Sequence, residues 1–304
     1  VWTLANLCEN PEYPSTDMQS CLSVFCRRTF HKDMKVVREA VRGILMLSFK
    51  EEWLESIYTS NVLTEVVEFL RSEDWKLVKL SLKIVGHFAA GSDQQVQYLI
   101  DAVALPSIIS LMKSTRKYFM KEASRTAGNI ACGTLEQIIA LLNAGVTAPA
   151  IYVLENGDKD SVIEALHLLT NITTVCKMDQ LVYLEKQDVI PAVCKHLNGR
   201  NSSGVYNALK CIHNILRIAD KYDELDEYLE LIEEAHGKEL MEQLQTHENK
   251  TISSRASYVL DKYFNDIEVT DTETDSERGS GDTICDDGEE MVMQVSTDFV
   301  YDFN

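Results

Sequence analysis

Helix-breaking residues are scarce in this chain, whose 304 residues include only 5 prolines and 13 glycines. Proline disrupts helix interiors and glycine weakens them, so their scarcity leaves room for many helical segments. Sparse glycine also argues against the glycine-rich loops that cradle nucleotide phosphates. Because 45% of the residues are hydrophobic, the chain can still bury a long core.

Paired cysteine motifs are also missing, since none of the eight cysteines forms a CxxC pair. This argues against a zinc site and against a disulfide framework. We interpret Cys8, Cys132 and Cys211, which lie in apolar segments, as small buried hydrophobes in a reducing compartment. The sequence therefore predicts no metal site.

No stretch approaches 18 consecutive apolar residues, and no cleavable signal peptide is visible. We therefore expect neither secretion nor membrane insertion. Catalytic motifs such as GxSxG and HExxH are absent, and the seven histidines are scattered, so we expect no enzyme activity and no cofactor. With 29 Lys and Arg against 48 Asp and Glu, nucleic-acid binding is disfavoured.

The main positive feature is a segment that recurs at nearly constant spacing. Residues 120–133, MKEASRTAGNIACG, can be aligned through Asn129 with similar apolar segments elsewhere. Successive aligned positions are 40, 41, 42, 42 and 43 residues apart: Asn6, Met46, His87, Asn129, Asn171 and Asn214. A helical period of about 40–47 residues is typical of armadillo and HEAT repeats, whose units bury their apolar faces by stacking on one another.

Each later unit follows the same order of a short helix, a turn, a second helix, a polar loop and a long third helix. Pro106 and Pro149 lie at the expected start of second helices, where a fixed φ is favourable and the missing N–H costs nothing. Three helices per unit favour armadillo over HEAT repeats.

The period divides the chain into four expected parts. Residues 1–16 form the last helix of a truncated repeat and a linker, 17–220 about five armadillo repeats, and 221–264 an atypical terminal repeat. Residues 265–304 contain 13 acidic residues and one Arg278, which predicts a disordered acidic tail. Because Val1 falls inside a repeat helix without a polar capping unit, we expect further repeats to precede it.

Several segments resemble the C-terminal half of importin α, the armadillo adaptor family that carries nuclear-localisation signals. They are VWTLANLC (1–8), KEASRTAGNIACGTLEQI (121–138), IEEAHGKELMEQLQTHEN (232–249) and YVLDKYF (258–264). The resemblance implies an all-α, right-handed superhelical armadillo solenoid that binds the signals of cargo proteins in its concave groove. It also implies importin β as a partner through an N-terminal arm missing here, recycling by an exportin with Ran, and a location in cytoplasm and nucleus.

In a family of this kind, an Asn on each third helix can pair with the N–H and C=O of an extended peptide, and a Trp one turn earlier grips lysine stems. The resemblance places Trp2 and Asn6 at the edge of the major signal-binding site. It places Asn129 and Asn171, with Glu122 and Glu164, at the minor site.

The Trp column departs from this pattern. Four residues before each aligned position the sequence has Trp2, Arg42, Lys83, Arg125, His167 and Lys210. A cation there removes the lysine slot and repels an incoming lysine. Three interpretations stay open: a residual basic-signal site, a basic column that binds an acidic segment such as the tail from Thr270 to Glu290, or an ion-pair ladder in which Arg125 pairs with Glu122 or Glu164.

The resemblance would place exportin binding on the terminal repeat. The candidate residues are Glu233, Glu234, Gln245, His247, Glu248 and Asn249. The alternative is that His247 and Asn249 only cap helix ends.

We therefore predict a non-catalytic adaptor of nuclear protein import. The alternative is a degenerate armadillo scaffold with a basic groove column, which has exchanged cargo for an acidic or other non-cargo partner.

Overall fold

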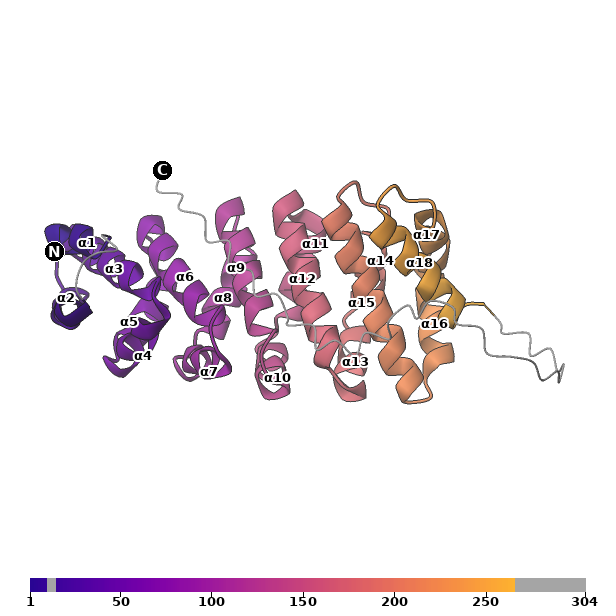
Figure 1. Cartoon of the computed structure of the whole chain (residues 1–304), viewed down its shortest axis with the longest axis horizontal. Coiled ribbons are helices and arrows are strands. Elements are labelled where there is room, and N and C mark those ends of the chain that lie inside the picture. The colour runs from indigo at the N-terminus through magenta and orange to yellow at the C-terminus, as the bar shows by residue number, and fades with distance from the viewer. Residues whose placement is uncertain (10–14, 266–304) are drawn as a thin grey trace, which may run out of the picture.

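The computed structural model describes residues 1–9 and 15–265, and within these ranges the chain consists of helices and their connections, without strands (Figure 1). The expectation of an all-α protein is confirmed. The expected tail beyond Asn265, and residues 10–14 of the expected linker, lie outside the described residues.

Most helices fall into five consecutive triplets, as the repeat order predicts. The first helices are α4 (Glu51–Thr59), α7 (Asp93–Asp101), α10 (Leu135–Asn143), α13 (Met178–Glu185) and α16 (Leu225–Glu234). The second are α5 (Val62–Glu68, continued by the 3-10 turn Phe69–Arg71), α8 (Leu105–Met112), α11 (Thr147–Asn156), α14 (Val189–Cys194) and α17 (Gly237–Leu244). The third are α6 (Trp75–Ala89), α9 (Lys117–Ile130), α12 (Lys159–Val175), α15 (Ser202–Lys221) and α18 (Lys250–Tyr263). Before them come α1 (Trp2–Cys8), α2 (Ser15–Arg28) and α3 (Met34–Ser48), and we count α1 and α3 as third helices because they pack in series with α6.

Local sequence explains where the third helices begin. The side chains of Asp33, Asp74, Asp158, Asn201 and Asn249 each accept a backbone N–H in the first turn of α3, α6, α12, α15 and α18. Such caps satisfy N–H groups that have no partner inside the helix. Repeated Asp and Asn caps therefore fix the start of these helices in the same register.

The turn between first and second helices also repeats. In each triplet one residue there has a left-handed backbone: Asn61 (φ 60°), Val103 (φ 58°), Gly145 (φ 84°), Asp188 (φ 59°) and His236 (φ 58°). Glycine and asparagine adopt this conformation readily, whereas a β-branched residue such as Val103 is strained in it. The sharp bend that results is 90° between α7 and α8 and 74° between α10 and α11.

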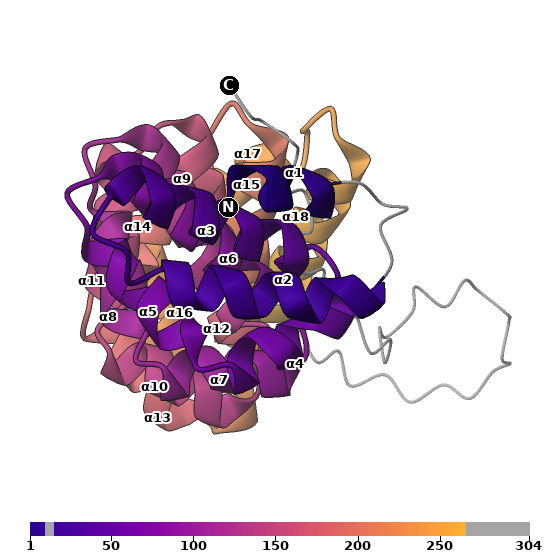
Figure 2. The ribbon, with the colours of Figure 1, turned by 90° about the vertical axis from the view of Figure 1, so that its left-hand side faces the viewer.

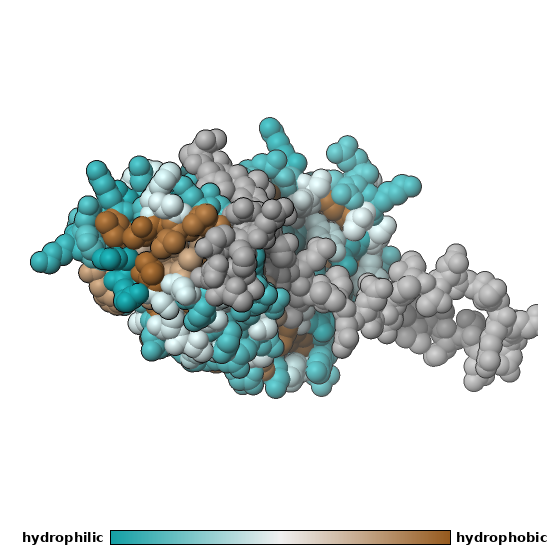
Figure 3. Space-filling view, turned by 60° about the vertical axis from the view of Figure 1, so that its left-hand side comes forward, coloured by the Kyte–Doolittle hydropathy of each residue, from teal (hydrophilic) through white to brown (hydrophobic). Residues whose placement is uncertain are grey.

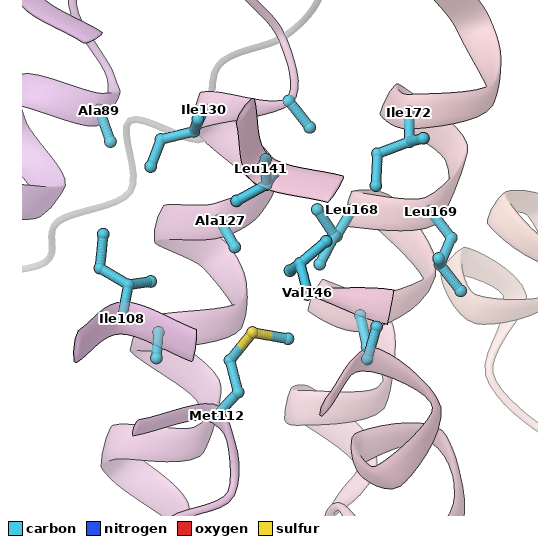
Figure 4. Close-up of a cluster of buried hydrophobic side chains, with 14 of the residues drawn as sticks. Ala89, Ile108, Met112, Ala127, Ile130, Leu141, Val146, Leu168, Leu169 and Ile172 are labelled. Atoms are coloured by element: carbon cyan, nitrogen blue, oxygen red, sulfur yellow. The ribbon is translucent and has the colours of Figure 1, made fainter. Parts of the chain in front are cut away.

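The units stack so that consecutive third helices pack against each other, from α1 through α3, α6, α9, α12 and α15 to α18. Seen along the stack, α7, α10 and α13 line one edge, and α8, α11 and α14 line another (Figure 2). Buried apolar side chains form a continuous core from Ala5 to Tyr263. Figure 4 shows this core, where Ala127 lies between Ile108 of its own triplet and Val146 and Leu168 of the next unit.

None of the described helices is by itself long and apolar enough to cross a membrane. Only the bent pairs α7 with α8 and α10 with α11 reach the necessary length and composition, each as a combined segment.

Candidate peptide-binding face

The third helices place all the aligned positions on one series of neighbouring elements, which we call the ladder face (α1, α3, α6, α9, α12, α15 and α18). Trp2 and Asn6 lie on α1, and each later third helix up to α15 carries one residue of the altered column followed by one aligned residue. The structure therefore brings the sequence-predicted groove residues into one row.

At the centre of the ladder face, Arg125 lies between two carboxylates. Its Nε and Nη2 donate to Glu164 Oε1 on the next third helix at 3.0 and 2.8 Å, and its Nη1 lies 3.7 Å from Glu122 Oε1. All three side chains are 11–14% exposed. Burial raises the pKa of Glu122, and the Arg125 charge opposes that rise. This is the ion-pair arrangement that the sequence left open as one alternative.

Arg42 makes a second cluster at the N-terminal end of the face. Its Nη2 donates to Asn6 Oδ1 at 2.6 Å and to Glu39 Oε2 at 3.0 Å, while Nη1 pairs with Glu9. Trp2 on α1 is 62% exposed, and Asn6 is half-buried. The side chain of Asn6 is thus bound to a cation of its own chain.

The aligned asparagines Asn129, Asn171 and Asn214 are buried, whereas side chains that bind a peptide backbone must be accessible to it. Asn171 Nδ2 donates to Gly128 O at 2.9 Å and to Cys132 Sγ at 3.1 Å, both in the preceding triplet. Asn214 Nδ2 donates to Thr170 O and to two threonine hydroxyls, and Asn129 is only 2% exposed. Because the N–H groups of Asn171 and Asn214 are occupied, these side chains offer a peptide mainly an acceptor oxygen.

The remaining column residues are partly desolvated. Burial, together with the charges of Lys210 and Arg125, lowers the pKa of His167, and the Glu164 charge opposes this effect. Burial, followed by the charge of Arg255, lowers the pKa of Lys210. The aligned residue His87 contacts Ser48 Oγ through Nδ1 at 2.7 Å, and burial lowers the pKa of His87 to about 4. Near neutral pH His87 is therefore uncharged.

A hollow of about 720 Å³ lies between α3 and α6, and we call it the α3–α6 groove. One carboxylate, from Glu39, and six cationic side chains line it: Lys35, Arg38, Arg42, Lys76, Lys79 and Lys83. The sequence analysis identified only Arg42 and Lys83 among them. A lysine recurs near the start of third helices at a step of 41 residues, as Lys35, Lys76 and Lys117 show, and this pattern could have identified Lys35 and Lys76.

Apolar side chains are also exposed toward this end of the molecule. Trp2, Leu7, Phe30, Met34 and Trp75 are all 39–72% exposed. Figure 3, turned so that the α1 end comes forward, shows a hydrophobic patch in a mainly hydrophilic surface. Trp75 lies beneath two cations, with Arg116 5.4 Å and Lys76 5.6 Å from its ring centre.

The exportin candidates surround the turns of the terminal repeat. Glu233 and Glu234 end α16, and Glu233 pairs with Lys238 at 2.8 Å. Asn249 caps α18 by accepting the Thr251 N–H, and the ring of His247 accepts the Asn249 N–H at 2.9 Å. Gln245 follows α17, and Glu248 is exposed. Asn249 thus has the capping role that the sequence left open, while an exportin-binding role for this surface stays a prediction.

Seven cysteines of the described residues are free thiols. Burial raises the pKa of Cys176, Cys194 and Cys211 to about 12, so these thiols are protonated near neutral pH. Within residues 1–9 and 15–265, no three His, Cys, Asp or Glu side chains come together in a way that could hold a metal ion.

Sequence comparison identifies relatives for nearly the whole chain. Importin subunit alpha-1b of Oryza sativa subsp. japonica is 31% identical over 272 residues, which is 87% of this chain and 51% of that protein. Importin subunit alpha-3 of Arabidopsis thaliana is 28% identical over 289 residues, or 92% of this chain and 53% of that protein. The chain spans about half the length of these relatives. A family model described as an atypical Arm repeat matches residues 226–277.

Structural comparison identifies armadillo solenoids. A computationally designed armadillo repeat protein for modular peptide recognition has a TM-score of 0.74 at 24% identity, covering 80% of this chain and 99% of its own. A designed armadillo repeat protein in complex with the peptide (KR)4 has a TM-score of 0.72 at 23% identity, with the same coverage. The predicted armadillo fold and the resemblance to importin α are both confirmed.

Proposed function

We propose that this armadillo-repeat chain, similar to importin α subunits over about nine tenths of its length, is a non-catalytic adaptor that binds extended segments of other proteins along its ladder face and takes part in nuclear protein import. The observation that carries the proposal is this similarity, which spans both the repeats and the terminal unit. Cargo signals, importin β, a recycling exportin with Ran, and movement between cytoplasm and nucleus all belong to the proposal.

The fold supports a peptide ligand because a stack of third helices presents equivalent side chains at regular steps. A peptide in an extended conformation repeats with a short, regular rise, so successive helices can contact successive parts of it. One structural neighbour is a designed armadillo protein in complex with (KR)4, which makes a basic peptide a reasonable first ligand to test.

The cluster of Glu122, Arg125 and Glu164 is where we propose that a lysine binds. Two carboxylates share one guanidinium there, so the cluster carries a net negative charge that a second cation can complete. The competing effect is repulsion by Arg125, which weakens binding compared with a site that has an aromatic residue in its place.

The test is a fluorescence anisotropy titration of the chain with a bipartite lysine-rich peptide at two salt concentrations. We expect salt-sensitive binding that Glu122→Gln with Glu164→Gln weakens at least about tenfold, because Arg125 then loses both counter-charges. Glu155→Gln with Glu230→Gln removes the same charge from exposed positions on α11 and α16, and we expect little change. No binding, or equal losses for both pairs, would contradict the proposal.

A second candidate function is favoured by the α3–α6 groove, whose lining has six cations and one carboxylate. In this alternative the chain is a degenerate armadillo scaffold that binds an acidic or other non-cargo partner there. The same titration with an acidic peptide distinguishes the two functions, because the lysine-rich peptide binds near α9 and α12, and the acidic peptide near α3 and α6.

A further inference from the structure

Among the residues that the structure describes, some cations of the α3–α6 groove have carboxylate partners and others have none. Arg38 pairs with Asp74, and Arg42 pairs with Glu9 and Glu39. Among residues 1–9 and 15–265, no carboxylate lies within ion-pair distance of Lys35, Lys76 or Lys79; the Lys79 ammonium instead lies 5.1 Å from the ring of Tyr118. The groove therefore presents at least three positive charges for which the described part of the chain supplies no anion.

Two of these lysines lie in the first turns of the helices that form the groove. Lys35 and Lys76 are the second residues of α3 and α6. Asp33 and Asp74 cap these helices by accepting backbone N–H groups, but neither helix has an acidic residue in its first turn. Helix N-termini carry a partial positive charge, so acidic side chains are the stabilising choice there. Lysine occupies both first-turn positions instead, and both lysines line a hollow that an anionic chain can enter.

The same protein contains an anionic chain of suitable composition. Residues 271–290 include nine acidic residues and a single cation, Arg278. The lysines of the groove that have no ion-pair partner among the described residues carry the opposite charge and lie in a different part of the chain, before Asn265. Charge complementarity thus points to this acidic segment as the occupant.

The acidic segment is long enough to reach the groove. Neighbouring helices pack about 8–10 Å apart, so the five steps from α18 back to α3 cover roughly 50 Å. The 25 residues from 266 to 290 span up to about 80 Å when extended, at roughly 3.3 Å each. A tethered segment also has a high effective concentration, so weak contacts suffice to keep it bound.

We propose that the acidic segment 271–290 binds the α3–α6 groove of its own chain through its C-terminal half, about residues 281–290, and competes there with acidic partners. The proposal rests on the second candidate function and names the ligand and the regulation of that groove. It follows that the N-terminal end of the ladder face is occupied until the tail is displaced, for example by salt or by a partner with more negative charge.

The test uses the full chain and a fluorescent peptide of residues 271–290. In a neutral-tail variant, the nine acidic residues of this segment are changed to Asn or Gln, which opens the groove. We expect the peptide to bind the neutral-tail variant at least about tenfold more tightly than the native chain, because the native tail competes at high effective concentration.

Groove specificity is tested in the neutral-tail background. Lys35→Glu with Lys76→Glu should reduce peptide affinity at least about tenfold. Lys113→Glu with Lys186→Glu makes the same change of net charge at exposed lysines outside the groove, and we expect less than about a threefold effect. Lys35→Gln with Lys76→Gln serves if the charge reversals disturb folding, which thermal unfolding followed by circular dichroism reports.

The outcomes separate the proposals. Equal peptide affinity for the native and neutral-tail chains overturns binding of the chain's own tail, although a measurable affinity in both would leave the second candidate function standing. Equal losses for the two lysine pairs overturn the α3–α6 groove as the site. The lysine-rich peptide is not used here, so failure leaves the import proposal unaffected.

Discussion

Arg125 on α9 donates two hydrogen bonds to one carboxylate oxygen of Glu164 on α12, at 3.0 and 2.8 Å. The contact joins adjacent armadillo units at the position where importin α resemblance implies a tryptophan. A residue that the sequence marks as a departure from a binding motif therefore also links two repeats.

Removing this link should destabilise the solenoid. We expect Arg125→Ala to lower the free energy of unfolding by about 3 kcal/mol, because it leaves the carboxylates of Glu122 and Glu164 partly buried without their cation. Urea unfolding at pH 7 measures this. Lys121→Ala breaks the more exposed pair with Asp160 and should cost less than about 1 kcal/mol; equal costs for the two variants would contradict the account.

Restoring an aromatic side chain at the same position should improve binding of a basic peptide. Arg125→Trp removes a positive charge that repels the peptide lysines and supplies an aromatic ring face. Together these changes should improve the binding free energy by about 1–2 kcal/mol, or roughly a tenfold gain in affinity. Anisotropy with the lysine-rich peptide measures it. Arg125→Leu removes the charge alone, so an equal gain for Leu and Trp would show that the ring makes no contribution.

Stability should fall in mild acid because of two desolvated histidines. Burial lowers the pKa of His87 and of His213 from 6.5 to about 4. Between pH 6.5 and pH 4 the folded state therefore binds fewer protons than the unfolded chain. The contribution of the two neutral histidines to the free energy of unfolding is full above pH 6.5 and is lost as pH falls toward 4. We expect the urea midpoint to drop between pH 7 and pH 5.

The matched variant for this effect is His87→Gln with His213→Gln, which cannot be protonated. Its urea midpoint should depend less on pH in the same window than that of the native chain. An unchanged pH dependence in the double variant would show that other groups cause the acid destabilisation.

A backbone prediction concerns Val103, which is 60% exposed and has φ 58°. Val103→Gly should stabilise the protein by about 1 kcal/mol, because the relief of left-handed strain exceeds the entropic cost of glycine. The reciprocal change at the equivalent turn, Gly145→Val (φ 84° in the native chain), should destabilise by a similar amount. Thermal unfolding checks both, and a loss of stability in Val103→Gly would contradict the strain argument.

The sequence predicted the fold in considerable detail. Aligning Asn129 with its counterparts locates the third helices, because a stacked repeat must return the same apolar positions to the same face. The prolines Pro106 and Pro149 lie in the first turns of α8 and α11, as expected from their fixed φ.

The candidate site was predictable as a row of positions, and the pairing of Arg125 with Glu122 or Glu164 was one of the three interpretations that the sequence left open. The choice among those interpretations, and the other contacts across the row, depend on the offset between neighbouring helices, which a single sequence does not give. The bond from Asn171 to Gly128, which occupies the amide nitrogen, and the hollow between α3 and α6 both depend on that offset.

The central claim, that the ladder face binds extended protein segments, is tested most directly by photo-cross-linking of the full chain with lysine-rich and acidic peptides that carry a reactive residue, followed by mass spectrometry. The account predicts cross-links on third helices, near α9 and α12 for the lysine-rich peptide and near α3 and α6 for the acidic one. Cross-links confined to first and second helices, or no more than a scrambled peptide gives, would contradict it.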